Sequence, residues 1–481
     1  MMAGISLEEI TQACDEAFLV NTEASSSELR IAGISHDSRF VTQGDLFACI
    51  PGTQTDGHTH AAEALASGAA ALLVERRLDY AVPQILVSDV RKVIGHVAAT
   101  VYGNPSNSMT VVGVTGTAGK TTTVHALAQA LEACGAQAGV IGTLDGGHTT
   151  PEAPEMQRAL ASMRDSAKEW VCVEVSSHGL DFGRVEGVQF AATVFTNLSA
   201  EHLDFHKDME AYYQAKRRLF DKESQYAIVS IIDDWGKRLV TELRDLGHEG
   251  LVVVDPEMVQ SPKLGADGST FVWRGQQITS ALLGKFNLLN LLVAGETLRA
   301  FGWDEDAIAD GLQRVSPVKG RMEPVVVPDS GVAVVVDYSH KPQALAEALK
   351  AVRHLSDGRV WVVFGAGGER DAAKRPLMGE IAGTLADEVV VTSDNPRSES
   401  AEAIANDIVS GIGSQGAHCR VVLDRAEAIH LAISDAKIGD VVLIAGKGHE
   451  TQQIIGEQRR PFDDVSVSNE ALLSRIGSGA G

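Results

Sequence analysis

Short apolar runs recur along the chain, and many of them are followed directly by glycine or polar residues. The run Val111–Val114 has the length and composition of a buried strand. Apolar residues then recur at helical spacing from Val124 to Leu131, and Gly135 supplies a stop signal. This pattern predicts a strand, a glycine-containing loop and a helix in direct succession.

Two further runs, 171–175 and 192–197, predict strands in the same central region. The first contains Glu174, and a charge within an apolar strand is costly unless it is paired or bound to a metal ion. Glu174 is therefore a magnesium candidate, with a solvent-facing position at the strand end as the alternative. His202 follows the second run and could join Glu174 at a metal ion, although a lone histidine in such a loop is more often structural.

The last part of the chain contains apolar runs that each lead into a polar cluster. The runs are 332–336, 360–364, 388–392 and 441–445. The clusters that follow begin at Asp337, Gly365, Asp394 and Gly446. In open α/β sheets, ligands bind beyond the carboxyl ends of the strands. The pattern therefore predicts a ligand site on a parallel sheet, and the glycines at 365–368 lack the G-x-G-x-x-G spacing of a dinucleotide site.

The N-terminal region alternates strand-like and helical patterns and ends at a Tyr-Gly-Asn-Pro-Ser cluster, residues 102–106. We predict an α/β chain with domains at 1–107, 108–317 and 318–481. In the first domain, the pair Ser38–Arg39 and the loop 52–58 could bind a phosphorylated ligand. A capped turn and a surface loop are the alternative, which the local signal favours.

The loop after the first central strand, residues 116–122, has the chemistry of a phosphate-binding loop. Its glycines let backbone N–H groups approach phosphates, and the following helix N-terminus favours negative charge. Lys120 can reach the β- and γ-phosphates, and Thr121 can hold Mg²⁺. Val114 occupies the place of the first glycine of the usual motif, so a chance glycine-rich turn is the alternative.

Length, composition and charge exclude several classes of protein. The length of 481 residues suits about three domains, and 44% hydrophobic residues suffice for their cores. The formal charge of −23 disfavours nonspecific binding to nucleic acid or anionic membranes. Five scattered cysteines without a C-x-x-C pair indicate reduced thiols, and we find neither a signal peptide nor an apolar run of about 18 residues. We expect a cytoplasmic protein without a membrane span.

The motifs, taken in order, resemble the Mur ligases of peptidoglycan synthesis along nearly the whole chain, in particular those that add the third amino acid. The matching segments are GTAGKTT at 116–122, TTPE at 149–152, EVSSHGL at 174–180, FTNLSAEHLDFH at 195–206, Lys216, FNLLN at 286–290, GRME at 320–323, DYSH at 337–340, KRPLM at 374–378, DNPR at 394–397 and GKGHE at 446–450. The resemblance implies an N-terminal UDP-binding domain, a central P-loop ATPase-type domain with a parallel sheet, and a C-terminal Rossmann-like domain. Two departures are His148, where some relatives have Asn, and the segment 338–341, where the family usually has Y-A-H-T.

Carried over by position, the resemblance assigns roles to individual residues. The ATP phosphates would bind Gly116, Thr117, Ala118, Gly119, Lys120, Thr121 and Thr122. Other ATP contacts would come from Asn290, Arg321, Asp337 and His340. Magnesium would be served by Thr121, Glu174, His202 and Lys216. The catalytic residues would be Lys120, Glu174, His202, Lys216 and His340. The UDP part would bind Ser38, Thr53, Gln54 and Thr55. The muramoyl dipeptide would bind Thr149, Thr150, Ser176 and Arg184.

Lys216 matches the carbamylated lysine of the family. The sequence alone would favour a solvated helix residue, since a helix is predicted over 209–220. A carbamate is an anion and can support Mg²⁺, which an ammonium group cannot do.

The residues that the resemblance assigns to the incoming amino acid are Arg370, Asp394, Asn395, Pro396, Arg397, Gly446 and Glu450. The DNPR segment is similar to the signature of enzymes that add meso-diaminopimelate. A distal carboxylate suits the guanidinium of Arg397, and a distal ammonium suits a carboxylate such as Glu450. Addition of lysine or ornithine stays open.

The implied reaction is ATP-dependent amide formation on UDP-N-acetylmuramoyl-L-Ala-D-Glu through an acyl phosphate, by a monomer that acts on small molecules. Catalysis would rest on positioning and charge neutralisation. One rival is another ligase of the superfamily, such as a folylpolyglutamate synthetase, and the TTPE and DNPR segments disfavour it. The other rival is an ATPase that forms no bond, which would leave the C-terminal clusters without a role.

Overall fold

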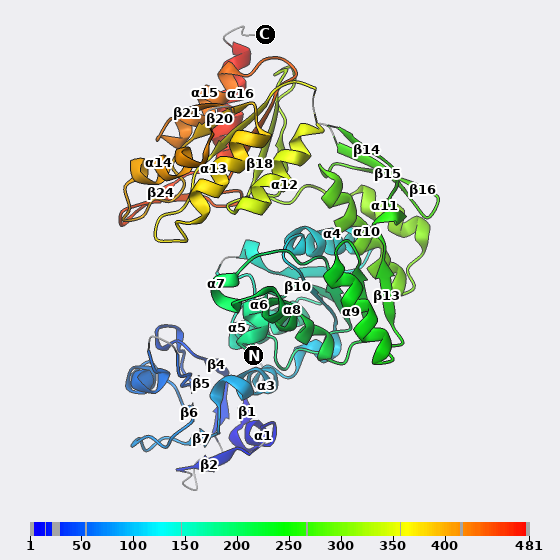
Figure 1. Ribbon diagram of the computed structural model, residues 1–481. Coiled ribbons are helices and arrows are strands. Elements are labelled where there is room, and N and C mark those ends of the chain that lie inside the picture. The colour runs from blue at the N-terminus through cyan, green and yellow to red at the C-terminus, as the bar shows by residue number, and fades with distance from the viewer. Residues whose placement is uncertain are drawn as a thin grey trace. The chain divides into compact units, whose positions relative to one another are not determined.

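Figure 1 labels the helices and strands of the chain in a computed structural model. The structure describes residues 4–14, 16–21, 29–52, 55–145, 147–265, 268–355, 357–413 and 417–477. The chain divides into two compact units. The first comprises Met1–Pro256 with Val293–Trp303, and the second comprises Glu257–Leu292 with Asp304–Gly481.

The N-terminal part of the first unit holds a mostly parallel sheet. Its strands lie in the order β2 (Phe18–Val20), β7 (Gln84–Leu86), β6 (Ala71–Val74), β5 (Asp45–Ala48) and β4 (Gly33–Ser35), with β2 antiparallel to β7. Leu46 packs in one core with helices α1 (Leu7–Gln12) and α3 (Val90–Val101). Its neighbour Phe47 packs in another core with α2 (Ala61–Ala66). Because successive strand residues point to opposite faces, helices cover both faces of this sheet.

The central sheet of the first unit is parallel and carries the predicted phosphate loop. The strand order is β13 (Leu251–Val254), β12 (Tyr226–Ser230), β11 (Ala192–Phe195), β8 (Thr110–Thr115), β10 (Trp170–Glu174) and β9 (Ala138–Ile141). Helices α5 (Ala153–Asp165), α8 (Met209–Arg217) and α9 (Asp234–Asp245) pack on one face around Val111 and Val173. Strand β8 lies inside the sheet, between β10 and β11, so the segments that follow these three strands meet at one edge.

The second unit contains a small antiparallel sheet that the sequence pattern did not predict. It consists of β14 (Gln260–Gly265), β15 (Gly268–Trp273) and β16 (Gln276–Ser280). Burial alternates along β15, with Phe271 and Trp273 inside. Helix α11 (Glu305–Gln313) packs against β16. Helix α10 (Lys285–Ala300) is divided between the two units after Leu292.

The C-terminal sheet has the order β17 (Glu323–Val325), β18 (Ala333–Asp337), β22 (Val441–Ala445), β19 (Val360–Phe364), β20 (Glu388–Val391) and β21 (His418–Val421). Strand β17 is antiparallel to β18, and the other pairs are parallel. Helices α12 (Pro342–Arg353), α13 (Lys374–Leu385) and α14 (Ala401–Gly411) pack around one core, and α15 (Arg425–Asp435) and α16 (Asp464–Gly477) pack around a second. Figure 1 shows this layered arrangement, which confirms the predicted α/β class.

The apolar runs found in the sequence are strands in the structure, with shifts of a residue or two at their ends. The helix predicted over 209–220 ends earlier, because α8 stops at Arg217 and a 3-10 turn covers Arg218–Asp221. The predicted domain boundaries stay predictions. Among the helices of the described residues, none combines the length and apolar character needed to cross a membrane.

Arg425 on α15 and Asp464 on α16 form an ion pair with both side chains fully buried. Arg425 Nε and Nη2 donate to the two carboxylate oxygens at 2.7 and 2.8 Å, and Nη2 also donates to Ala445 O at 3.0 Å. We expect Arg425→Met to lower the free energy of unfolding by about 3–5 kcal/mol, because it leaves a buried carboxylate unpaired.

Urea denaturation followed by circular dichroism measures this loss. The matched double variant Arg425→Met/Asp464→Leu should recover most of it, because no unpaired charge then stays in the core. A loss below about 1 kcal/mol in the single variant, the size typical of exposed pairs, would contradict the prediction.

Candidate active site

The loop 116–119 connects β8 to helix α4 (Lys120–Ala133) and needs glycine at both ends. Gly116 has φ +150° and Gly119 has φ +86°. A side chain at Gly116 would overlap the hydroxyl of Thr196. The backbone can therefore follow this tight course only without a Cβ atom. The predicted strand, loop and helix are all present, which argues against a chance turn.

Two lysines converge on the same backbone carbonyl of this loop. Lys120 Nζ donates to Gly116 O at 2.8 Å and to Thr117 O at 2.9 Å. Lys216 Nζ, from α8, donates to Gly116 O at 2.8 Å. Lys216 is 1% exposed and its Nζ lies 4.6 Å from the centre of the Tyr212 ring. The alternative of a solvated helix residue at Lys216 is therefore wrong.

Two residues directly after β11, Thr196 and Asn197, hold the loop backbone. They lie in the matched segment 195–206, but neither was assigned a role. Asn197 Oδ1 accepts from Ala118 N at 3.0 Å, and Asn197 Nδ2 donates to Ala118 O at 3.0 Å. Thr196 Oγ1 also donates to Ala118 O, at 2.7 Å. The sequence did contain a signal for their role, namely a polar Thr-Asn pair directly after an apolar strand. Only the structure shows that this strand is adjacent to β8.

Glu174 ends β10 as a buried carboxylate, 1% exposed. Its Oε2 accepts from Thr121 Oγ1 at 2.8 Å, and its Oε1 accepts from Thr143 N at 2.8 Å. The solvent-facing alternative for Glu174 is therefore wrong. Within the ranges that the structure describes, no three His, Cys, Asp or Glu side chains lie together as a metal-binding group.

His202 lies in a group of aromatic rings. Its backbone has φ +55°, and its ring centre is 4.9 Å from that of His178 and 6.2 Å from that of Tyr212. Tyr212 OH in turn lies 3.2 Å from Thr117 Oγ1. Tyr212 is thus near both the ring of His202 and the phosphate loop.

The residues predicted to bind the muramoyl dipeptide lie around the end of β10. Thr150 Oγ1 donates to Glu174 O at 2.9 Å and lies 3.0 Å from the hydroxyl oxygen of Ser176. Arg184 Nη1 donates to Thr150 O at 3.1 Å. Thr149 Oγ1 accepts from the Thr143 hydroxyl at 3.2 Å. The structure thus brings Thr149, Thr150, Ser176 and Arg184 together.

The residues predicted to bind the UDP part are only partly described. Ser38 is buried, and its Oγ donates to Glu63 Oε2 at 2.8 Å. Thr55 is exposed. Thr53 and Gln54 lie outside the described residues.

The second unit carries the remaining ATP candidates. Asn290 Nδ2 donates to Asn287 Oδ1 at 3.0 Å within α10. Asp337, at the end of β18, accepts from Met322 N at 2.8 Å and from the hydroxyl of Ser339. Burial raises the pKa of Asp337. Ser339 is one of the departures from the usual family pattern, and its hydroxyl supplies this extra donor to the carboxylate.

His340 is neutral at physiological pH, because burial and, secondarily, Lys341 lower its pKa to about 4. Its Nδ1 lies 2.8 Å from Tyr338 O, which can only accept. In the neutral ring the proton is therefore on Nδ1, and Nε2 is an acceptor. That atom suits a hydroxyl or amino donor of a nucleotide better than a phosphate oxygen.

The segments after β20 and β22 form a buried polar cluster. Asn395 Nδ2 donates to Glu450 Oε2 at 2.8 Å. Lys447 Nζ donates to Asn395 Oδ1 and to Glu450 Oε2, both at 3.0 Å. Lys447 is fully buried. Lys447 belongs to the GKGHE segment, in which the resemblance assigns roles to Gly446 and Glu450 but none to the lysine.

Asp394, Pro396, Arg397 and Gly446 lie on the same loops, and Arg370 lies in the loop that follows β19. Arg397 Nη1 donates to Gly368 O at 2.6 Å. Gly446 has φ +116°, and a side chain there would lie 2.7 Å from the Asp394 carboxylate. Pro396 is buried, and Arg370 is exposed.

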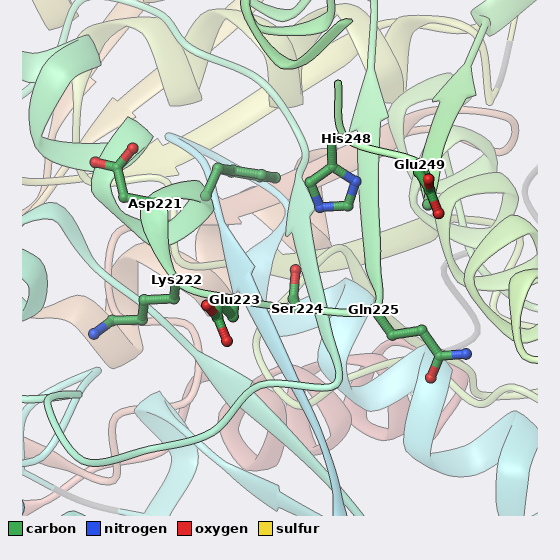
Figure 2. A pocket seen from close by; sticks show the side chains of 9 residues that line it. Asp221, Lys222, Glu223, Ser224, Gln225, His248 and Glu249 are labelled. Atoms are coloured by element: carbon green, nitrogen blue, oxygen red, sulfur yellow. The ribbon is translucent and has the colours of Figure 1, made fainter. Parts of the chain in front are cut away.

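An open depression, shown in Figure 2, is lined by residues 220–225 and 248–250. These residues precede β12 and β13, whereas the phosphate loop follows β8. Since the strands are parallel, the depression and the loop lie at opposite edges of the central sheet. We assign it no role in the chemistry.

Three family descriptions match successive parts of the chain. They are "Mur ligase family, catalytic domain" over residues 30–104, "Mur ligase middle domain" over 114–298 and "Mur ligase, glutamate ligase domain" over 320–448.

Individual relatives match nearly the whole length. The UDP-N-acetylmuramoyl-L-alanyl-D-glutamate--2,6-diaminopimelate ligase of Gloeobacter violaceus is 44% identical over 94% of this chain and 96% of its own. A solved structure of a ligase with that name covers 98% of this chain and 99% of its own, with 32% identity and a TM-score of 0.70. The MurF ligase of Thermotoga maritima in complex with ADP covers 93% and 97%, with 21% identity and a TM-score of 0.62, and supports the fold alone.

Proposed function

Since the chain belongs to the Mur ligase family and is an ATP-dependent ligase of peptidoglycan synthesis, we propose that it joins meso-diaminopimelate to UDP-N-acetylmuramoyl-L-alanyl-D-glutamate in the cytoplasm. The relatives that it matches over nearly their whole length carry the name of that activity. The observation that carries the choice of amino acid is the cluster of Asn395, Arg397 and Glu450 beyond β20 and β22.

The charges of this cluster suit a diamino dicarboxylic acid. Arg397 uses Nη1 for Gly368 O, and its fork-shaped guanidinium offers further donors to a distal carboxylate. Glu450 offers a carboxylate to a distal ammonium group. Lysine and ornithine lack the distal carboxylate, so they leave the guanidinium of Arg397 without its partner.

The first chemical step is attack of the D-glutamate carboxylate on the γ-phosphate of ATP, which gives an acyl phosphate and ADP. The amino group of diaminopimelate then attacks the carbonyl carbon, and phosphate leaves. Lys120 places its ammonium group beside the phosphate loop and offsets the charge of the phosphates. Thr149, Thr150, Ser176 and Arg184 are proposed to hold the dipeptide whose carboxylate reacts.

The oxygen atoms of Thr121 and Glu174 lie next to each other and fit Mg²⁺, because this ion prefers oxygen ligands. His202 and a carbamylated Lys216 complete the proposed set. When bound, Mg²⁺ would neutralise phosphate charge. The burial of Lys216 beside the phosphate loop supports a role for its modified form there.

The test is phosphate release with ATP, Mg²⁺ and UDP-N-acetylmuramoyl-L-alanyl-D-glutamate, with the amino acid varied. We expect kcat/KM for meso-diaminopimelate to exceed that for L-lysine or L-ornithine by about 100-fold or more, because the smaller side chains leave the Arg397 site unpaired. Mass spectrometry of the product identifies the bond formed.

The two contrary outcomes would refute different parts of the proposal. Preferred use of lysine or ornithine would leave the assignment as a ligase intact and refute the role of Arg397. Steady phosphate release without any amino acid and without a tripeptide product would overturn the ligase itself.

A further inference from the structure

Lys447 is a fully buried lysine in the second unit, in the loop that follows β22. It stands between Gly446, with φ +116°, and Gly448, with φ +51°. A side chain at Gly448 would lie 2.7 Å from Tyr338 Cβ. Two glycines thus give the backbone a course that carries the Lys447 side chain into the interior.

The ammonium group of Lys447 has a defined set of partners. It donates to Glu450 Oε2 and to Asn395 Oδ1, both at 3.0 Å. A buried cation is tolerated only when such partners compensate it. Backbone Glu450 N also donates to Lys447 O at 2.9 Å, which closes a turn between the two residues.

These bonds determine how the Asn395 amide is oriented. Its Oδ1 accepts from Lys447 Nζ and, at 2.9 Å, from Ile454 N. Since both of these groups only donate, Oδ1 must face them, and Nδ2 faces Glu450. Asn395 therefore donates to Glu450 Oε2 at 2.8 Å.

The same bonds hold the Glu450 carboxylate by one oxygen atom. Oε2 accepts from both Asn395 and Lys447. The Glu450 side chain is 33% exposed, so it reaches from the buried lysine towards solvent. A carboxylate that is fixed at one oxygen presents the other in a single direction.

We infer that Lys447 is a positioning residue, which orients the Asn395 amide and the Glu450 carboxylate so that Glu450 receives the distal amino group of the diamino acid. This inference rests on the proposed function. Lys447 touches neither the reacting carboxylate nor the phosphates in this role. It acts through Glu450, both directly and by way of the Asn395 amide, which donates to the same carboxylate oxygen.

The test compares Lys447→Met with Lys350→Met in the full chain. Lys350, on α12, also pairs with a glutamate three positions away, Glu347, at 2.8 Å, but both side chains are 57% exposed. We expect Lys447→Met to raise KM for meso-diaminopimelate by about tenfold or more, because the Glu450 carboxylate loses a charged partner that fixes it. KM for ATP should stay within about twofold in both variants.

A second amino-acid substrate distinguishes the loss of Glu450 positioning from a general loss of structure in Lys447→Met. L-2-aminopimelate keeps the distal carboxylate of diaminopimelate and lacks the distal amino group. The wild type should prefer diaminopimelate in kcat/KM, and Lys447→Met should lose most of that preference. An unchanged preference would overturn the inference, as would equal increases in KM for ATP and for the amino acid.

The pair Glu450→Gln and Lys447→Met/Glu450→Gln covers the case in which Lys447→Met fails to fold, because the double variant keeps the net charge of the wild type. In the double variant no unpaired carboxylate is buried beside the lost lysine. If Lys447 acts through Glu450, adding Lys447→Met to Glu450→Gln should change KM for diaminopimelate by less than about twofold. A further tenfold rise would overturn the inference.

The wild type also separates this inference from the proposed function. Failure of the wild type to form tripeptide with any diamino acid would refute the function. Product formation by the wild type and by Lys350→Met, with unchanged kinetics in Lys447→Met, would refute the role of Lys447 alone.

Discussion

Lys120→Met should lower kcat for tripeptide formation by about 10³-fold, since a positioned cation that stabilises phosphate charge contributes strongly to the rate of phosphoryl transfer. The Lys120 ammonium group donates to the carbonyls of Gly116 and Thr117 and so lies inside the phosphate loop. Methionine keeps the length of the side chain and removes the charge.

The measurement is phosphate release under saturating substrates, with product identified by mass. Lys92→Met is the matched control, because Lys92 lies in the same unit with its side chain 82% exposed. That control should keep its kcat within about twofold. Ligation by Lys120→Met at more than about a tenth of the wild-type rate would contradict the role of Lys120.

Arg397→Ala should raise KM for meso-diaminopimelate by about 100-fold, which corresponds to about 3 kcal/mol for a charged, forked contact to a carboxylate. The backbone at Arg397 is held independently of its side chain. Arg397 N donates to Ile454 O at 3.2 Å, and Arg397 O accepts from Gly456 N at 2.7 Å. The φ of +53° is as unfavourable for alanine as for arginine, so the substitution adds no backbone strain.

Steady-state kinetics with each substrate varied in turn measures this effect. KM for ATP should stay within about twofold, and L-lysine should become a relatively better substrate because it does not need the lost guanidinium. Arg314→Ala, at the exposed residue that caps the C-terminus of α11, serves as the control. Equal losses for ATP and for diaminopimelate would count against a role of Arg397 in amino-acid recognition.

The sequence by itself determined the α/β class and the strands that carry the chemistry. Strands buried on both faces are largely apolar, so β8, β10, β19 and β22 stand out as short runs rich in valine. The phosphate loop could also be predicted, because its glycines, lysine and threonines lie together in one short segment of the sequence. Local chemistry of this kind needs no knowledge of distant contacts.

The tertiary structure decided which polar residues are buried and what they touch. Lys216 looked like a solvated helix residue, and only the packing of α8 brings it to Gly116, a hundred positions earlier in the chain. The neutral state of His340 follows from burial, which no local pattern encodes. Likewise β14 is exposed or half-buried throughout, and β15 and β16 alternate between buried and more exposed residues. Their signal in the sequence is weaker than that of a buried parallel strand.

The cluster of Asn395, Lys447 and Glu450 shows, within one site, both what the sequence determines and what only tertiary contacts decide. The sequence pattern placed Asn395 and Glu450 after the carboxyl ends of two apolar runs, and their chemistry suggested a ligand. It could not show that Lys447 lies between them, because the three side chains meet only when β20 and β22 are in one sheet. Strand runs and loop motifs are local properties of the chain, whereas burial, charge pairing and side-chain orientation arise from contacts between segments that are distant in sequence.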